Sequence, residues 1–149
     1  WKEEHLRLLE QFYRKTPYFG TYFEDFKEIL LKDYKSLSHL SSELILWFMK
    51  RLNINTEVLY SSEIVDKSIV GGDRILTILK ELNATKYITG SGPGSIRYIK
   101  EEDFKDAGIE LEWQDYVHPT YRQINGDFIP YMNILDLIFN EGPNGISKI

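Results

Sequence analysis

The sequence predicts an α/β protein in which a three-helix N-terminal segment precedes a small parallel sheet with βαβ units. Apolar residues recur at helical spacing through the first third of the chain. Beyond residue 55, short β-prone runs alternate with helical patterns, an order typical of parallel βαβ units. The chain has 149 residues, of which 42% are hydrophobic and 28% are charged, enough to bury one core. We therefore expect a single α/β domain over residues 1–149.

Three helices are expected before the sheet, over residues 2–15, 21–34 and 37–52. Pro17 separates the first two, because a proline and the residue before it disfavour a continuous helix. Ser36 has a side chain favoured at the N-cap of the third helix. The first third of the chain is therefore predicted to be helical throughout, apart from its turns.

The strands are predicted from β-prone runs bounded by turn residues. We expect three of them, parallel in one sheet, with the second strand buried and the third half-exposed: 56–60, 86–89 and 109–116. A helix over 73–82 would be the right-handed crossover between the first two. A short helix near 101–107 is closed by Gly108. A last helix over 133–140, with Asn133 as its cap, is followed by a frayed tail.

The composition excludes several classes of function. The net charge is −5 and no basic track is present, so no nucleic-acid partner is expected. No apolar run approaches the roughly 20 residues that span a bilayer, so no membrane insertion is expected. The absence of cysteine excludes disulfides and thiol catalysis, and it agrees with a cytoplasmic location. Three scattered histidines give no ligand spacing, so no metal site is expected.

Three properties stay open at this level. Nothing in the residue pattern identifies a cofactor or an oligomeric state. The chain does not begin with methionine, so we expect it to be a piece of a longer protein.

A glycine-rich loop follows the second predicted strand. Open α/β sheets bind ligands at the carboxyl ends of their strands, and exposed backbone N–H groups can hold an anion there. The glycine spacing matches neither a phosphate-binding P-loop nor a dinucleotide fingerprint, so a plain connecting turn is the alternative. Arg74 could also meet an acidic ligand, or it could be a solvated helix charge. The candidate ligand-binding residues of this region are Gly90, Ser91, Gly92, Gly94, Arg97 and Arg74.

The loop over residues 116–130 gathers aromatic and hydrogen-bonding side chains before the last helix. His118 could act as a general acid or base, or it could bond a backbone carbonyl and fix the loop. Tyr121, Arg122 and Gln123 supply a ring face and directional donors for a ligand. We expect His118 and Tyr121 to converge with Arg97 and the glycine-rich loop on one concave surface.

Asp136 stands inside an apolar helical run and shares one helix face with Asn140 at i, i+4. A carboxylate in such a run is costly unless it is paired. We therefore expect Asp136 to be buried and bonded to the 118–128 loop, through His118, Arg122 or backbone N–H groups. It would orient that loop as a clamp or, alternatively, contact substrate directly. Asn140 is a further candidate for ligand binding.

Five sequence blocks match, in order, the pattern of a known family. They are Trp1…His5-Leu6…Leu9 with Thr16–Phe19, then Gly72–Leu76, Tyr87–Gly92, Tyr116–Gln123, and Gly126–Pro130 leading to Ile134–Asn140. Through these blocks the chain resembles the WbqC-like family, which is found in bacterial polysaccharide gene clusters. The last two blocks are the most specific, and together the five span nearly the whole chain.

The resemblance implies a cytoplasmic enzyme of bacterial surface polysaccharide (O-antigen or capsule) biosynthesis. It would be a transferase for an activated sugar or acyl donor, with a small-molecule substrate and a nucleotide-linked donor. The alternative is a non-catalytic binding or scaffold protein of the same pathway. Family members open with a Gln-Pro-x-Tyr-x-Pro-Trp type segment that this sequence does not contain, so we expect the C-terminal two-thirds of such a protein. Thr89 stands where a Ser is usual, and the Ser91–Gly94 stretch holds one extra small residue.

Overall fold

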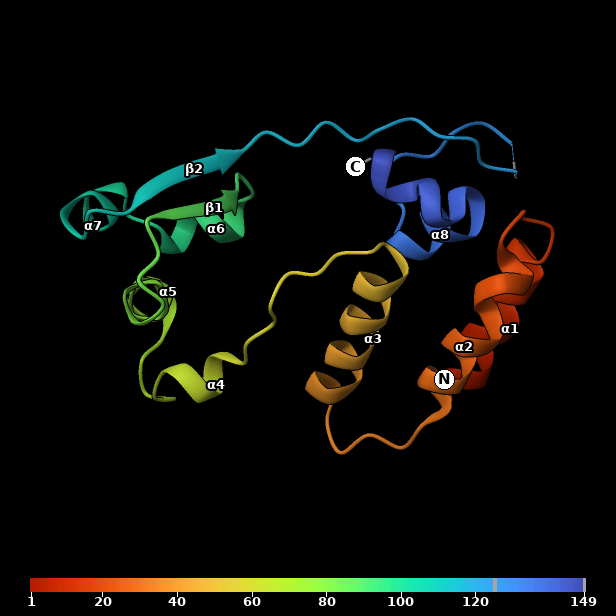
Figure 1. The fold of residues 1–149 in the computed structure, drawn as a ribbon, viewed down its shortest axis with the longest axis horizontal. Helices are drawn as coiled ribbons and strands as arrows, with labels where there is room; N and C mark the ends of the chain where they lie inside the picture. The colour runs from red at the N-terminus through yellow and green to blue at the C-terminus, as the bar shows by residue number, and fades with distance from the viewer. Residues whose placement is uncertain (125, 149) are drawn as a thin grey trace. The chain divides into compact units, whose positions relative to one another are not determined.

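The computed structural model describes residues 1–124 and 126–148 and confirms the α/β class (Figure 1). Its internal contacts separate two compact units. A helical unit comprises residues 1–56 and 118–149, and an α/β unit comprises residues 57–117. Each unit has its own hydrophobic cluster. The single domain over residues 1–149 stays a prediction.

The helical unit confirms the three predicted N-terminal helices. Its elements are α1 (Lys2–Tyr13), α2 (Phe19–Leu31), α3 (Leu37–Arg51), α8 (Ile134–Glu141) and the 3-10 helix η1 (Gly142–Lys148). Both predicted caps are present: the Ser36 hydroxyl accepts from the His39 N–H at 3.3 Å, and the Asn133 Oδ1 accepts from the Leu135 N–H at 2.9 Å.

The frayed tail predicted after the last helix is wrong, because residues 142–148 continue as η1. Gly142 joins the two helices with a φ of +59°, in the left-handed region that favours glycine. A Cβ at this position would also lie only 2.5 Å from the ring of Tyr18. Backbone conformation and close packing therefore both require a glycine at the turn.

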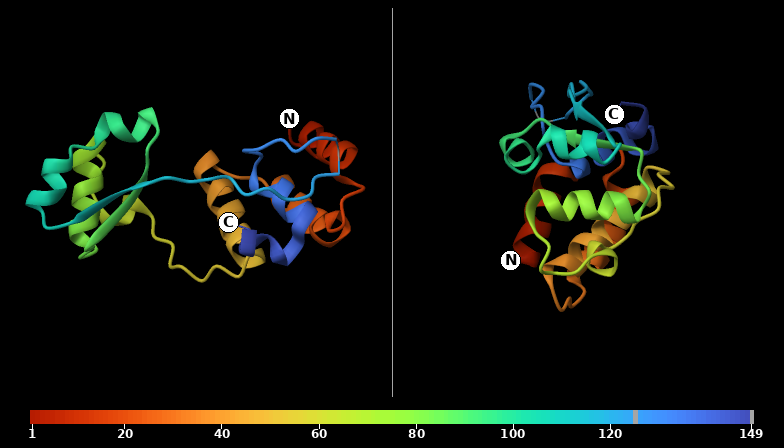
Figure 2. Two further views of the ribbon diagram at one scale, coloured as in Figure 1. Left: turned by 90° about the horizontal axis from the view of Figure 1, so that it is seen from above. Right: turned by 90° about the vertical axis from the view of Figure 1, so that its left-hand side faces the viewer.

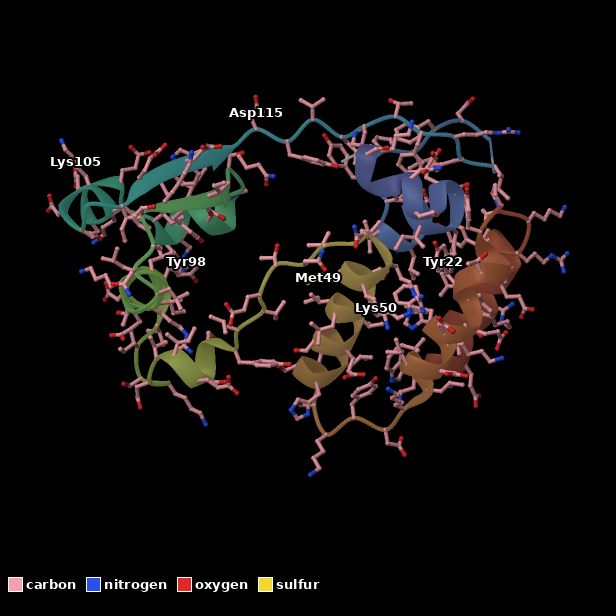
Figure 3. All side chains as sticks on the ribbon, viewed as in Figure 1. Tyr22, Met49, Lys50, Tyr98, Lys105 and Asp115 are labelled. Carbon is pink, nitrogen blue, oxygen red and sulfur yellow. The ribbon has the colours of Figure 1, made fainter. Side chains whose placement is uncertain are left out.

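Helix α8 is central to the core of the helical unit. Residues 135–140 are all buried, including the polar Asp136 and Asn140, so every side of the helix faces the protein interior. Figures 1 and 2 show α8 beside the N-terminal helices, and the Tyr18 N–H donates to the Phe139 carbonyl at 3.0 Å. Tyr22, labelled in Figure 3, packs edge-on against Trp47 with ring centroids 6.3 Å apart. The buried cluster comprises Leu6, Tyr22, Phe23, Phe26, Leu30, Leu40, Trp47, Leu52, Leu135, Ile138 and Phe139.

The α/β unit contains the small parallel sheet. Strands β1 (Lys86–Gly90) and β2 (Glu110–Gln114) pair in parallel, with Lys86 opposite Glu110 and Gly90 opposite Gln114. The helices are α4 (Ser61–Ile64), α5 (Gly71–Glu81), α6 (Pro93–Tyr98) and α7 (Glu101–Asp106). Gly108, with a φ of +70°, follows α7 as predicted. The buried residues of this core are Ile99, Phe104 and Ile109.

Two strand predictions are wrong. Residues 56–60 form no strand, and the sheet has two strands within the part of the chain that the structure describes. The side chains of Val58, Leu59 and Tyr60 are exposed, so their β-propensity finds neither a partner strand nor a packing surface. Consequently α5 is not a crossover, and β1 and β2 are instead connected through α6 and α7. The predicted strand over 86–89, which is β1, is not buried either, since Ile88 is 56% exposed.

Candidate functional site

The buried carboxylate of Asp136 is the centre of the candidate site. Asp136 is 4% exposed and lies in the first turn of α8. The Tyr121 hydroxyl donates to its Oδ2 at 2.6 Å, and the Gln123 Nε2 donates to the same oxygen at 2.9 Å. The predicted burial and the bonding to the 118–128 loop are therefore confirmed. The partners are Tyr121 and Gln123, however, and not the suggested His118 or Arg122.

The Gln123 side chain forms hydrogen bonds within the loop as well as to α8. Its Nε2 also donates to the Ile129 carbonyl at 3.0 Å, and its Oε1 accepts from the Ile129 N–H at 2.8 Å. This pair of bonds joins the side-chain amide of Gln123 to the backbone N–H and carbonyl of Ile129. The Gln123 side chain therefore bonds both Ile129 and the carboxylate of Asp136. The role of Asp136 as a clamp of the loop, rather than a direct substrate contact, stays a prediction.

Two tyrosines experience the negative charge of Asp136. Burial, followed by the charge of Asp136 and hydrogen bonding to it, raises the pKa of Tyr13 above its usual range. Burial, followed by the hydrogen bond to Asp136 and its charge, likewise raises the pKa of Tyr121, with a smaller opposing effect of Gln123. Both phenols therefore stay protonated at neutral pH and remain hydrogen-bond donors.

A pocket of about 410 Å³ opens beside this cluster, entirely within the helical unit. Its volume lies in the range usual for small-molecule sites. Apolar side chains form most of its wall, and no Lys, Arg or His belongs to the described lining. The lining residues are Phe12, Tyr13, Gln123, Ile124, Ile129, Met132, Asp136 and Asn140.

Asn140 contributes an unsatisfied acceptor to this pocket wall. Its Nδ2 donates to the Asp136 carbonyl at 2.8 Å, four residues earlier on α8. Its Oδ1 is buried and has no hydrogen-bond partner among the described residues. Buried acceptors without a donor are uncommon in folded proteins, and each calls for an explanation.

Sequence reasoning missed Tyr13 and Phe12 as site residues. Both have the apolar spacing of the first predicted helix, where aromatic residues usually serve the core. Phe12 is instead 54% exposed and lines the pocket. The only available signal was a phenol on an apolar helix face, because a buried tyrosine hydroxyl usually finds a polar partner.

His118 lies in an aromatic cluster that begins the same loop. Its ring centroid is 5.1 Å from that of Tyr131, 5.8 Å from that of Phe128 and 6.1 Å from that of Tyr121. Its Nδ1 is 2.8 Å from the Pro119 carbonyl oxygen, which can only accept, so Nδ1 is the donor. Tyr121 therefore contacts both His118 and Asp136. The bond to Pro119 is the loop-fixing contact that the sequence left open as the alternative role.

The remaining candidates are exposed or bonded to their own surroundings. Gly90 ends β1, and Ser91 and Gly92 lead into α6, which begins at Pro93. The predicted glycine-rich loop is therefore shorter than expected, because helix α6 begins within it. Gly94 belongs to the first turn of α6. The Arg97 guanidinium lies 5.4 Å from the ring of Tyr98, which Figure 3 labels.

The other two arginines differ in their surroundings. Arg74 donates to the backbone carbonyls of Ser61, Asp66 and Ile69, so it fixes the segment before α5. Arg122 is exposed.

Arg97 and the glycine-rich loop belong to the α/β unit, whereas His118 and Tyr121 belong to the helical unit. The predicted convergence of these four features, and the ligand-binding roles assigned to them, stay predictions.

Residues 1–124 and 126–148 contain no group of three or more His, Cys, Asp or Glu placed to hold a metal ion. In the same ranges, every helix is too short or too polar to traverse a bilayer.

Comparison with known proteins shows which family the sequence matches. The sequence profile described as the WbqC-like protein family matches residues 1–148. The chain is 31% identical over 146 residues to a Mycobacterium tuberculosis (strain ATCC 25618 / H37Rv) protein named "Uncharacterized protein Rv1507c". The match covers 95% of this chain and 61% of that relative's length. No solved structure matches the chain significantly.

Proposed function

Because the chain belongs to the WbqC-like protein family, we propose that it is part of a cytoplasmic transferase of bacterial surface polysaccharide biosynthesis. The reaction would transfer a sugar or acyl group from an activated, nucleotide-linked donor to a small-molecule acceptor. The pathway class follows from the family resemblance. The chemistry of a ligand site is argued from the Asp136 pocket.

One observation carries the proposal of a ligand site. Asp136 is buried, is held by Tyr121 and Gln123, and lines a pocket of about 410 Å³. Well-packed apolar residues often replace a buried charge with no loss of stability, so packing alone does not require this carboxylate. A polar cluster that is fixed by several bonds and faces a pocket is the usual arrangement of a binding or catalytic site.

The roles of the individual residues follow from their chemistry. His118 would accept the proton that the acceptor loses, since a donating Nδ1 leaves the lone pair of the neutral ring on Nε2. Asp136 would orient Tyr121 and Gln123. Asn140 would position the acceptor together with those two side chains.

The donor would bind through its anionic part, which requires cations or backbone N–H groups. Residues 90–94 run from the end of β1 into the first turn of α6, and the exposed Arg97 lies in α6. Arg74 and Arg122 are the further cationic candidates. We assign the phosphate-bearing part of the donor to these groups, because the described lining of the Asp136 pocket contains no cation.

A thermal-shift screen of the full-length protein with nucleotides and nucleotide sugars tests the proposal. A ligand present at 100 times its Kd stabilises the folded state by about 2.7 kcal/mol. We expect at least one nucleotide sugar to raise the Tm, and Arg97→Ala to reduce that rise. Asp73→Ala, which removes an exposed-helix charge in the same unit, is the matched control.

The screen also distinguishes the alternative function. If no nucleotide or nucleotide sugar changes the Tm of the full-length protein, the transferase proposal is wrong. A non-catalytic binding or scaffold protein of the same pathway would then be the better account of the loop and pocket.

A further inference from the structure

The pocket beside Asp136 has an unusual balance of charge. Within the described residues, the groups that bond to the Asp136 carboxylate are the neutral Tyr13, Tyr121 and Gln123, and no ion pair involves Asp136. The described pocket wall also lacks Lys, Arg and His. A carboxylate in a partly apolar enclosure attracts cations and repels phosphates more strongly than one in water does.

The second acceptor in the pocket wall is the Oδ1 of Asn140. Asn140 is 7% exposed, and its Nδ2 is already bonded to the Asp136 carbonyl. The remaining Oδ1 is buried without a donor among the described residues. Asn140 follows Asp136 by one helical turn, so the two side chains lie on the same face of α8. Two lining residues on one face of α8 therefore carry a carboxylate and an amide oxygen that has no donor among the described residues.

The ligand chemistry that fits both acceptors is a protonated amine. An ammonium group has three N–H donors and a positive charge, so one group can bond an amide oxygen and interact with a carboxylate. A hydroxyl has a single donor and no charge, and a phosphate has the wrong sign. Phe12 and Met132 line the same pocket and suit an apolar ring face on the ligand. Aromatic rings also attract ammonium groups.

We propose that this pocket binds a small molecule through its protonated primary amine, with the amine at Asp136 and Asn140 and a ring against the apolar wall. The inference rests on the proposed function in one respect, because it makes this molecule the acceptor of the transfer. The pocket then receives an amino sugar or a similar ring amine, and the anionic donor binds elsewhere.

Matched ligand pairs test the amine requirement on the full-length protein. Isothermal titration would compare glucosamine with glucose, and cyclohexylamine with cyclohexanol, at a pH where both amines are protonated. We expect each amine to bind about tenfold more tightly than its hydroxyl partner, the factor that 1.4 kcal/mol provides. Glucose 1-phosphate should bind no better than glucose. Equal affinity within both pairs, or a preference for the phosphate, overturns the proposal.

Variants locate the binding within the pocket. Asn140→Leu removes the unpaired acceptor while keeping a similar volume, so the protein should fold and lose most of the amine preference. Asn55→Leu is the control, because Asn55 is exposed elsewhere in the helical unit. Side-chain amide resonances of Asn140 and Gln123 should move when glucosamine is added to the unsubstituted protein. Unchanged amine binding by Asn140→Leu, or the absence of these shifts, contradicts the assignment.

The outcomes separate this inference from the proposed function. Amine binding without any response to nucleotide sugars would support the pocket assignment and contradict the transferase. A nucleotide-sugar response without an amine preference would do the reverse.

Discussion

Replacing Asp136 with Asn is expected to destabilise the protein by about 2–3 kcal/mol. In the native structure two neutral donors, from Tyr121 and Gln123, bond to one charged oxygen. Hydrogen bonds to charged groups contribute about 1.5–3 kcal/mol each, and bonds between neutral groups about 0.5–1.5 kcal/mol. Making both bonds neutral therefore removes about 1.2 kcal/mol of stability for each bond, which gives the expected total of about 2–3 kcal/mol. The added amide N–H also has to fit beside groups that are themselves donors.

Urea unfolding followed by tryptophan fluorescence measures this change. Trp47 is buried in the core of the helical unit, so its fluorescence reports the unfolding of that core. For a chain of this size, the expected change corresponds to a fall in Tm of about 5–10 °C. Asp127→Asn is the matched control, since Asp127 is an exposed carboxylate of the same loop and should change stability by less than about 0.5 kcal/mol. Equal effects of the two substitutions would refute the clamp.

A double-substitution cycle isolates the bond between Asp136 and Tyr121. Asp136→Leu removes the acceptor and leaves the Tyr121 hydroxyl without its partner, which costs about 1–3 kcal/mol. Tyr121→Phe in the same protein removes that orphaned hydroxyl. The double variant should therefore be more stable than Asp136→Leu alone, with a coupling of about 0.5–3 kcal/mol. It should nevertheless have no amine binding. Strict additivity of the two single effects would contradict a direct bond.

Two further predictions concern pH and backbone conformation. The pKa values of Tyr13 and Tyr121 are raised in the folded state, so the unfolded chain ionises first. Stability is therefore full below the ordinary tyrosine pKa of about 10, and it should fall as the pH rises above that value. Tyr121→Phe should flatten this fall in urea titrations between about pH 9 and 11, and an unchanged slope would exclude Tyr121 as its origin. Gly142→Ala should lower the Tm, because φ is +59° and the added Cβ would lie 2.5 Å from Tyr18. Gly20→Ala, in open space within α2, should instead stabilise by about 0.5–1 kcal/mol, and equal behaviour of the two alanines would disprove the packing argument.

The helices could be predicted from the sequence because their signals are local. Ser36 and Asn133 cap their helices through hydrogen bonds that span two or three residues, so the sequence alone contains both partners. The same applies to Gly108, whose left-handed conformation ends α7. The strand predicted at 56–60 failed for the opposite reason. A strand requires a partner and a packing surface, and neither is encoded in Val58, Leu59 and Tyr60 themselves.

For the site, the sequence by itself determined that Asp136 would be buried and bonded. A carboxylate in the apolar run of α8 has to find donors when that helix enters the core. Which donors it finds was decided by the tertiary structure. Tyr121 and Gln123 lie 15 and 13 residues away along the chain, and the path of the loop, rather than any local pattern, brings them to Oδ2.

The pocket was likewise decided by the packing of α1 against the rest of the helical unit. Phe12 and Tyr13 have the spacing of core residues, and nothing in that spacing distinguishes a pocket wall from an interior. Nor could the sequence predict that the Asn140 Oδ1 has no donor among the described residues, because a missing partner is a property of the whole surroundings. Helical periodicity and the cost of burying charge act through local sequence, whereas the choice of partners and the space left between elements arise only when distant segments pack together.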